Sequence, residues 1–350
     1  MDRGIVHACF DEFVATGVVL FDDQQEQIEH VEDGLKFHFL LTPSTIKKPL
    51  FQQPPANPDP SSGRLEGSDI DTLGFEIPLS SGEIPLLSPS TSTYRPGGTR
   101  THFIVANKFA LARPHFLVLT SSGLRRQHEP LDRDDFEFAW FMLHSLPRRE
   151  KTLEGGAKDY LAFFNCGRDS GCSRVHKHMQ VLPMRWSGSG TDSGSSSGSG
   201  SEFFDLGRGS LISFLEGDAG QQEPEIPFSW FYQRFEKEDM TAPEVEGVYA
   251  NLLAQAETAG QTKGDIPDNT EPGAACPHNV IFTRRWMVVI PRRLARVSTE
   301  VGTNALGMLG VIPVGTSEEI ESWVRLGVKK ALAEMGVPRS EEGPTAKSVV

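Results

Sequence analysis

The sequence predicts a mixed α+β fold, because segments with helical periodicity alternate with short, strand-like apolar segments. Apolar residues recur at helical spacing in four segments that are expected to be helices: 5–21, 132–146, 245–256 and 317–335. Runs rich in β-branched and aromatic residues predict strands at 34–41, 102–106, 115–120 and 279–291. The last of these is expected to be a hairpin with Arg284 and Arg285 at its bend. The order of the elements does not by itself determine a topology.

Two of the predicted helices begin at residues that favour helix N-termini. Asp132 is expected to cap the helix over 132–146. Ser317 is expected to cap the final helix, which has Glu318 and Glu319 in its first turn. On that final helix the apolar residues are expected to face the core: Ile320, Trp323, Val324, Leu332 and Met335.

The chain of 350 residues is acidic, with 34 Lys and Arg against 47 Asp and Glu, a net charge of −13. This length suffices for one large core or two domains. Because an acidic chain is repelled by nucleic acid, a polyanionic substrate would require a locally basic site. We find no apolar signal segment after Met1 and no apolar stretch of the roughly 20 residues that cross a bilayer. Cys9, Cys166, Cys172 and Cys276 show no paired spacing, which is typical of reduced thiols. We expect a cytoplasmic protein, with the nucleus as a second compartment, and no nucleic-acid or membrane partner.

Two stretches lack periodicity. Residues 52–98 are rich in Pro, Gly and Ser, and are expected to be irregular. Residues 187–201 contain eight Ser and five Gly in fifteen positions, a composition typical of a flexible insert.

The segment most suggestive of chemistry runs from Asn165 to Pro183 and reads N-C-G-R-D-S-G-C-S-R-V-H-K-H-M-Q-V-L-P. If its second part is a strand, His176, His178 and Gln180 share one face, because successive side chains alternate. Lys177 is then the one polar residue on the opposite, apolar face. The preceding small residues, 170–173, form a loop whose backbone N–H groups could surround an anion. An anion-binding turn that leads to three aligned polar side chains predicts a reaction site.

This segment resembles the fungal-type diadenosine tetraphosphate phosphorylases, also called ATP adenylyltransferases, in the branch of the histidine-triad superfamily with Gln at the third position. Their segment runs approximately Y-N-x-G-x-x-S-G-[AS]-S-x-x-H-K-H-L-Q, and this chain differs mildly at Cys172 and Met179. Four further segments resemble the family in the same order: 42–49, 107–120, 279–291 and 302–315. Pro227 to Phe231 also resembles the start of the family's second half.

The resemblance implies an α+β fold of histidine-triad-like antiparallel sheets with packed helices, made of two related halves in one chain. Only the first half would carry the triad. We expect an N-terminal half over 1–186, a flexible Gly/Ser-rich insert over 187–224, a C-terminal ATP adenylyltransferase half over 225–338, and a tail over 339–350.

The resemblance also implies three catalytic residues. His178 would attack phosphorus as the nucleophile, His176 would orient the site and its backbone, and Gln180 would donate to a non-bridging oxygen. The nucleotide-binding residues carried over by the motif matches are Lys48, Asn107, Lys108, Asn165, Gly171, Cys172, Ser173, Arg174, Gln180, Asn304, Ala305 and Leu306.

The activity implied is reversible phosphorolysis of diadenosine tetraphosphate to ATP and ADP through a nucleotidyl-histidine. The expected partners are diadenosine polyphosphate, ATP, ADP and phosphate. The protein itself is expected to be a monomer. No protein-bound cofactor is expected, although Mg²⁺ or Mn²⁺ could accompany the nucleotide. Five arginines between 284 and 296, with no acidic residue among them, are a second candidate region for attracting phosphate: Arg284, Arg285, Arg292, Arg293 and Arg296.

Three alternatives stay open at this level. Ala305 stands where the family has Ser, and Gly315 where Lys is usual, so an impaired, dinucleotide-binding relative is one alternative. Another is a nucleotidyltransferase or hydrolase with a different acceptor. The third is a metal site made of Cys166, Cys172, His176 and His178, whose spacing does not match that of zinc fingers.

Overall fold

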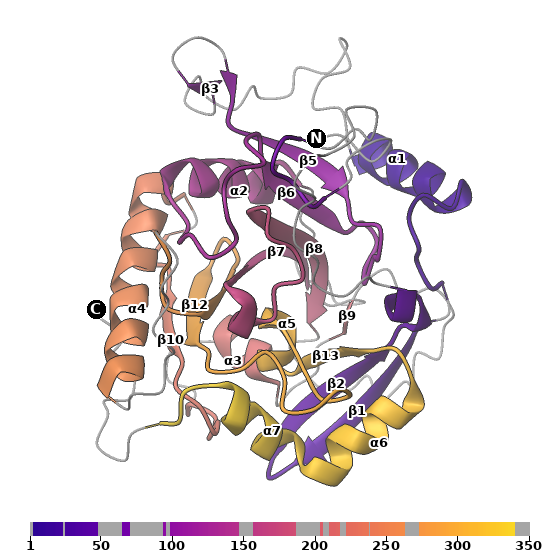
Figure 1. The fold of residues 1–350 in the computed structure, drawn as a ribbon, viewed down its shortest axis with the longest axis vertical. Helices are drawn as coiled ribbons and strands as arrows, with labels where there is room; N and C mark the ends of the chain where they lie inside the picture. The colour runs from indigo at the N-terminus through magenta and orange to yellow at the C-terminus, as the bar shows by residue number, and fades with distance from the viewer. Residues whose placement is uncertain are drawn as a thin grey trace.

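A single large antiparallel sheet organises the molecule (Figure 1). The computed structural model describes residues 3–23, 25–47, 65–70, 94–95, 99–146, 157–186, 204–205, 210–217, 222–237, 239–262 and 273–339. Its eight-stranded sheet has the order β10-β12-β11-β7-β8-β6-β5, with β9 paired to β8 in parallel. The strands are β5 (His102–Ala106), β6 (Phe116–Thr120), β7 (Ala157–Cys166), β8 (His178–Trp186), β9 (Phe204–Asp205), β10 (Phe231–Arg234), β11 (His278–Phe282) and β12 (Trp286–Pro291).

A smaller sheet lies beside the large one, with the order β1-β2-β13. Its strands are β1 (Glu26–Glu32), β2 (Leu35–Leu41) and β13 (Val311–Val314), and β13 runs parallel to β2. Two short strands, β3 (Tyr94–Arg95) and β4 (Thr99–Arg100), pair with each other. The helices are α1 (Arg3–Ala15), α2 (Arg133–Ser145), α3 (Leu211–Glu216), α4 (Ala242–Thr262), α5 (Ala305–Met308), α6 (Ser317–Leu326) and α7 (Val328–Met335), with 3-10 turns η1 (Pro43–Lys47) and η4 (Arg168–Ser170).

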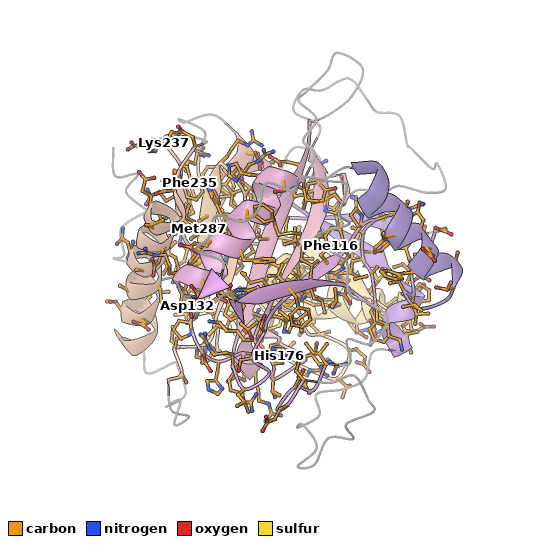
Figure 2. The ribbon with its side chains drawn as sticks, turned by 90° about the horizontal axis from the view of Figure 1, so that it is seen from above. Phe116, Asp132, His176, Phe235, Lys237 and Met287 are labelled. Carbon is orange, nitrogen blue, oxygen red and sulfur yellow. The ribbon has the colours of Figure 1, made fainter. Side chains whose placement is uncertain are left out.

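The large sheet separates two hydrophobic cores, because side chains alternate between its faces. On β7, Leu161 and Phe163 belong to the core shared with the small sheet, α3, α6 and α7. Ala162 and Phe164 belong to the other core, under α2 and α4. Phe116 on β6 and Met287 on β12 belong to this second core as well, and Figure 2 shows them apart across the width of the sheet. Both faces of the central strands are therefore buried, and only their ends are available for a site.

The predicted α+β class is confirmed, and most predicted elements lie where expected. β5 coincides with the predicted strand, and the hairpin of β11 and β12 turns at Arg284 and Arg285 as predicted. Asp132 caps α2 in a reciprocal arrangement: its side chain accepts from the Asp135 N–H, and the Asp135 side chain accepts from the Asp132 N–H.

The C-terminal helix differs from the prediction. It is divided at Gly327, whose φ of 89° is outside the helical range, into α6 and α7. The N-terminus of α7 is stabilised by Glu32 of β1, which accepts from the N–H groups of Val328 and Lys329. The prediction that Ser317 caps α6 is wrong by one residue, since Thr316 accepts from the Glu319 N–H. Val324 was predicted to face the core and is instead 43% exposed.

The insert predicted over 187–224 contains regular structure in its second part. β9 pairs with β8, and Leu211 and Ile212 of α3 are buried in the core. Residues 187–203 lie outside the described residues, as do most of the predicted irregular stretch 52–98 and Lys48. The other domain limits stay predictions.

The two predicted halves are joined within one sheet, because β11 pairs with β7. In this register Asn279 lies opposite Asn165, and His278 lies opposite Cys166. The C-terminal ends of β7 and β12 therefore lie at the same edge of the large sheet. The loop that begins at Gly167 leaves the sheet at this edge.

Candidate active site

The site predicted from the sequence is the connection between the central strands β7 and β8. It comprises η4 and an extended segment that leads to His178, the first residue of β8. Gly167 and Gly171 have φ values of 84° and 86°, which residues with a Cβ rarely adopt. At Gly171 a Cβ would also lie 2.5 Å from the Thr303 carbonyl oxygen. Glycine at 171 thus allows this loop to touch the loop before α5.

His178 is held by its backbone and by one ring nitrogen. Its N–H donates to Gln127 Oε1 at 2.8 Å, and Gln127 Nε2 donates to its carbonyl at 3.0 Å. Its Nδ1 lies 2.8 Å from the His176 carbonyl oxygen. Because a carbonyl can only accept, Nδ1 carries the proton, and the lone pair of the neutral ring is on Nε2. This geometry is that of an imidazole prepared to attack through Nε2.

His176 is fully buried, and the strand that was predicted to contain it begins at His178 instead. Its Nε2 lies 2.9 Å from the Thr120 carbonyl, so Nε2 is the donor. Its Nδ1, 2.8 Å from Ser68 Oγ, then accepts from that hydroxyl. Burial lowers the pKa of His176 to about 4, so the ring is neutral near pH 7. Figure 2 labels His176 among the surrounding side chains. These contacts fit the orienting role that was predicted for it.

Gln180 is oriented by two neighbours from the connection between β5 and β6. Its Oε1 accepts from His115 Nε2 at 3.0 Å and from Asn107 Nδ2 at 3.4 Å. The Leu111 N–H donates to His115 Nδ1, which leaves the proton of that ring on Nε2. Since the amide oxygen is engaged, the NH₂ group is the end of Gln180 that an anion would meet. The structure thus brings the predicted residue Asn107 to Gln180, whereas Lys108 projects an exposed side chain from the adjoining turn.

A buried polar network joins this loop to the C-terminal half. Asn165 Oδ1 accepts from Asn279 Nδ2 and from the Ala305 N–H, both at 2.9 Å. Asn279 Nδ2 also donates to the Ser170 carbonyl at 2.8 Å. Asn304 caps α5 by accepting from the Leu306 N–H at 3.0 Å. Asn165 and Gly171 therefore lie against the loop that leads into α5, and Cys172, Ser173 and Arg174 follow in the same loop as Gly171. The Asn165 side chain and the Leu306 N–H are themselves engaged in holding these loops.

Arg292 lies at the centre of this network and is fully buried. Its guanidinium donates to Asn279 Oδ1 at 2.6 Å and to the Leu294 and Thr303 carbonyls at 2.7 and 3.1 Å. Two longer bonds reach the carbonyls of Met335 and Ser170. Burial lowers the pKa of Arg292 to about 9, so it stays charged at pH 7.

The predicted arginine cluster is not assembled as one surface. Arg284 donates to Asp159 at 2.8 Å, and Arg285 is paired with Glu216. Both lie at the bend of the hairpin, at the opposite end of β12 from Arg292. The two carboxylates neutralise the arginines of the bend, so attraction of phosphate by the whole cluster is not supported.

Lys177 is the polar residue that the alternation placed on the apolar face. Its Nζ donates to Asp135 Oδ2 at 2.5 Å and to the Pro130 carbonyl at 2.7 Å. Asp135 also accepts from His102 Nε2 at 2.9 Å. Burial by itself would raise the pKa of Asp135, but these two donors lower it below its usual range. The lysine therefore anchors the His178 strand to α2.

Sequence reasoning missed Gln127, Ser68 and Asp69, which hold the backbone and ring of this segment. None of them lies in a segment whose pattern suggested chemistry.

The alternative metal site finds no support. Among the residues that the structure describes, no group of three or more His, Cys, Asp or Glu is placed to hold a metal ion. The Cys166 thiol donates to the His128 carbonyl at 3.3 Å. Burial raises the pKa of Cys172 to about 12, which disfavours the thiolate that a metal would bind. Within the same described part of the chain, no helix is long and apolar enough to cross a membrane.

Two family models match this chain in sequence order. The Ap4A phosphorylase N-terminal domain, named for diadenosine tetraphosphate (Ap4A), matches residues 98–193. The ATP adenylyltransferase C-terminal domain matches residues 224–338. Together the two models span more than half of the chain.

Two proteins of Saccharomyces cerevisiae are similar in sequence. Diadenosine 5′,5‴-P1,P4-tetraphosphate phosphorylase 2 is 26% identical over 255 residues, covering 69% of this chain and 72% of the relative. Protein APA1 is 26% identical over 245 residues, covering 66% of this chain and 68% of the relative.

The fold is similar to that of the yeast Ap4A phosphorylase Apa2, whose crystal structure was determined in complex with Ap4A. The TM-score is 0.64 at 21% identity, over 97% of this chain and 98% of the other. Another structure of Apa2, in complex with AMP, gives a TM-score of 0.64 at 19% identity, over 98% of each chain. From the two domain matches, their order and the shared fold, we conclude that the chain belongs to the Ap4A phosphorylase family.

Proposed function

We propose that this protein cleaves diadenosine tetraphosphate with inorganic phosphate to give ATP and ADP, through an adenylyl group carried on His178. The observation that carries the proposal is the 2.8 Å contact from His178 Nδ1 to the His176 carbonyl. It places the lone pair of the ring on Nε2, and it stabilises the positive charge that develops on the ring when Nε2 forms a bond.

The reaction has two displacements at one phosphorus atom. In the first, Nε2 attacks the α-phosphorus of the dinucleotide, the bond from that phosphorus to the bridging oxygen breaks, and ATP leaves with the electron pair. In the second, an oxygen of inorganic phosphate attacks the same phosphorus. The P–N bond breaks, its electron pair returns to Nε2, and ADP leaves. No net oxidation occurs, and the imidazole is regenerated.

The surrounding groups suit the charge of this substrate. The backbone at Gly171 and the residues just before α5, Thr303 and Asn304, lie together, and Arg292 is buried behind both loops. We propose that phosphate oxygens bind at the half-buried residues 171–174 and meet the NH₂ group of Gln180. The relatives support this assignment, because one is named as an Ap4A phosphorylase and the Apa2 structures were determined with Ap4A and with AMP.

The test is incubation with Ap4A, with and without phosphate, followed by chromatography of the nucleotides and intact mass of the protein. We expect ATP and ADP only when phosphate is present, and one adenylyl group on the wild type but not on His178→Ala. His30→Gln, on the edge strand β1, is the matched control and should be adenylylated normally. AMP formed without phosphate would indicate a hydrolase, and binding without turnover would indicate the impaired relative.

A second experiment addresses the third residue of the motif. A neutral amide at 180 cannot transfer a proton, so we propose that it leaves the adenylyl intermediate slow to react with water. Gln180→His should then shift the products from ADP toward AMP, and an unchanged AMP-to-ADP ratio would contradict this role.

Three expectations from the sequence stay proposals. We propose that Mg²⁺ or Mn²⁺ enters with the phosphate chain, so that a chelator slows turnover without unfolding the protein. We also propose a monomer, which light scattering would test, and a cytoplasmic location with the nucleus as a second compartment, which microscopy of a tagged chain would test.

A further inference from the structure

The segment Leu65–Ile70 contacts the residues just before β8, the strand that begins at His178, and it lies outside both matched domains, which cover 98–193 and 224–338. It is held closely: a Cβ on Gly123 would lie 2.4 Å from the Glu66 carbonyl oxygen. Arg126 Nη1 donates to the carbonyls of Gly67 and Gly123 at 3.1 and 2.7 Å. Ile70 is buried in a small apolar cluster with residues of β5 and β6. The segment is thus fixed on both sides of Ser68 and Asp69.

Asp69 binds the backbone just before the catalytic strand. Its Oδ2 accepts from the Val175 N–H and its Oδ1 accepts from the His176 N–H, both at 3.0 Å. A carboxylate can accept both bonds, since it has two acceptor oxygens. An asparagine could accept only one of them, because its NH₂ group would face the second N–H.

Ser68 holds the side chain of His176, as Asp69 holds its backbone. The ring donates from Nε2 to the Thr120 carbonyl, so Nδ1 requires a donor, and Ser68 Oγ lies 2.8 Å away. Ser68 is itself buried. Backbone and ring of His176 are therefore held by two adjacent residues of the same segment.

The carbonyl of this same residue, His176, accepts from His178 Nδ1. That carbonyl belongs to the peptide that follows His176, so its direction depends on how Asp69 holds the two preceding N–H groups and how Ser68 holds the His176 ring. We propose that Ser68 and Asp69 are positioning residues, which act through His176 to set the tautomer and orientation of the His178 ring. The inference deepens the proposed function and rests on His178 as the nucleophile.

The decisive variant is Asp69→Asn, which keeps the shape of the side chain and removes one of its two acceptors. We expect kcat for Ap4A phosphorolysis to fall by about tenfold or more, with KM changed by less than about threefold, because orientation and not substrate binding is lost. The matched control is Glu66→Gln, which removes an exposed carboxylate from the same segment and should leave both constants unchanged.

A spectroscopic readout separates positioning from general stability. In ¹⁵N NMR spectra of the protein without substrate, wild-type His178 should show a protonated Nδ1 and an unprotonated Nε2. Asp69→Asn and Ser68→Ala should both shift this population toward the other tautomer. Ser68→Ala removes one hydroxyl, so it keeps the test decisive if Asp69→Asn does not fold.

These experiments test the positioning role of Ser68 and Asp69 separately from the nucleophilic role of His178. If the wild type forms no adenylyl-His178, the proposed function fails, whereas the NMR comparison still tests the positioning. If the wild type turns over, and both variants keep its kcat and its His178 tautomer, Ser68 and Asp69 are not positioning residues. A lower melting temperature with unchanged kcat and tautomer would likewise overturn the inference.

Discussion

The two ends of β12 carry arginines in opposite electrostatic surroundings. At the hairpin bend, Arg285 is paired with Glu216, a carboxylate with a 1% exposed side chain. At the other end, the hydrogen bonds described for Arg292 all end on carbonyl or amide oxygens. The charge of Arg285 is thus offset by a directly bonded carboxylate, whereas Arg292 is bonded to neutral oxygens and is attracted by the nearby Asp169 carboxylate.

This difference explains how an acidic chain can bind a polyanion. The protein has a net charge of −13, which repels a phosphate chain at long range. Arg292 places one positive charge behind the loops at 170 and 303, at the edge of the sheet where His178 begins its strand. Because the surroundings of a buried charge screen it weakly, a single arginine can matter there more than several at the surface. The bend arginines, by contrast, stabilise the fold.

The largest expected effect comes from Arg292→Met. Five hydrogen bonds inside the protein would be lost, so the unfolding free energy should fall by about 3 kcal/mol or more. The KM for Ap4A should rise by at least about tenfold, because the loops at 170 and 303 separate and the charge is lost. Urea unfolding and steady-state kinetics at low temperature would measure the two effects. Arg292→Lys, which keeps the charge but not the planar fork, should give an intermediate KM.

Changing the opposite end of the strand should lower stability alone. Arg285→Met leaves Glu216 buried without its cation, although Trp286 Nε1 still donates to it at 2.7 Å, and should cost about 3 kcal/mol. The KM for Ap4A should stay within about twofold of wild type. Adding Glu216→Gln removes the buried charge and should restore part of the lost stability. A rise in KM as large as that of Arg292→Met would show that the two ends do not differ in function.

The pH dependence compares one buried histidine from each half of the chain. Burial lowers the pKa of both His176 and His278 to about 4. Since the unfolded value is about 6.5, the folded state prefers the neutral rings. Their contribution to stability is complete above about pH 6.5 and is lost as the pH falls toward 4. Between pH 7 and pH 5, each ring should reduce the unfolding free energy by about 2 kcal/mol.

Urea unfolding at pH 7 and pH 5 would measure this loss. His278→Gln, which replaces a ring bonded to Tyr249 and to the Cys276 carbonyl, should reduce the difference between the two pH values. An equal pH dependence in the variant and the wild type would contradict the assignment.

Local sequence patterns predicted the structural features that depend on residues close together in the chain. The strand over 102–106, the hairpin over 279–291 and the capping of α2 by Asp132 follow from alternation and from capping chemistry within a few residues. The loop glycines and the His178 segment were found through their resemblance to a family, and the structure places most of them together. Lys177 gave a further indication, since a lysine on an apolar face requires a buried partner.

Contacts between distant segments could not be predicted in the same way. Asp69 binds residues more than 100 positions later, and Glu32 caps a helix almost 300 positions later. Gln127 also carries no local pattern that distinguishes it from an exposed glutamine. The division at Gly327 is accompanied by such a contact, because only the folded chain brings Glu32 to the N–H groups that follow that glycine. Pairing of this kind requires the topology, which periodicity leaves open.

The smallest expected effect concerns the N-terminus of α6. This helix follows β13, which in turn follows the loop and α5 beside the candidate active site. Thr316 Oγ1 accepts from the Glu319 N–H at 3.2 Å, and Glu319 in turn accepts from the Gly315 N–H at 2.8 Å. Thr316→Ala should therefore lower the unfolding free energy by about 1 kcal/mol, the usual cost of a lost N-cap. Ser317→Ala should change it by less than about 0.5 kcal/mol, because Ser317 is an exposed residue within the first turn. Urea unfolding of both variants decides between the two residues. A larger loss of stability from Ser317→Ala would show that Ser317 is the N-cap, as the sequence predicted. A change in KM in either variant would show that the N-terminus of α6 affects substrate binding.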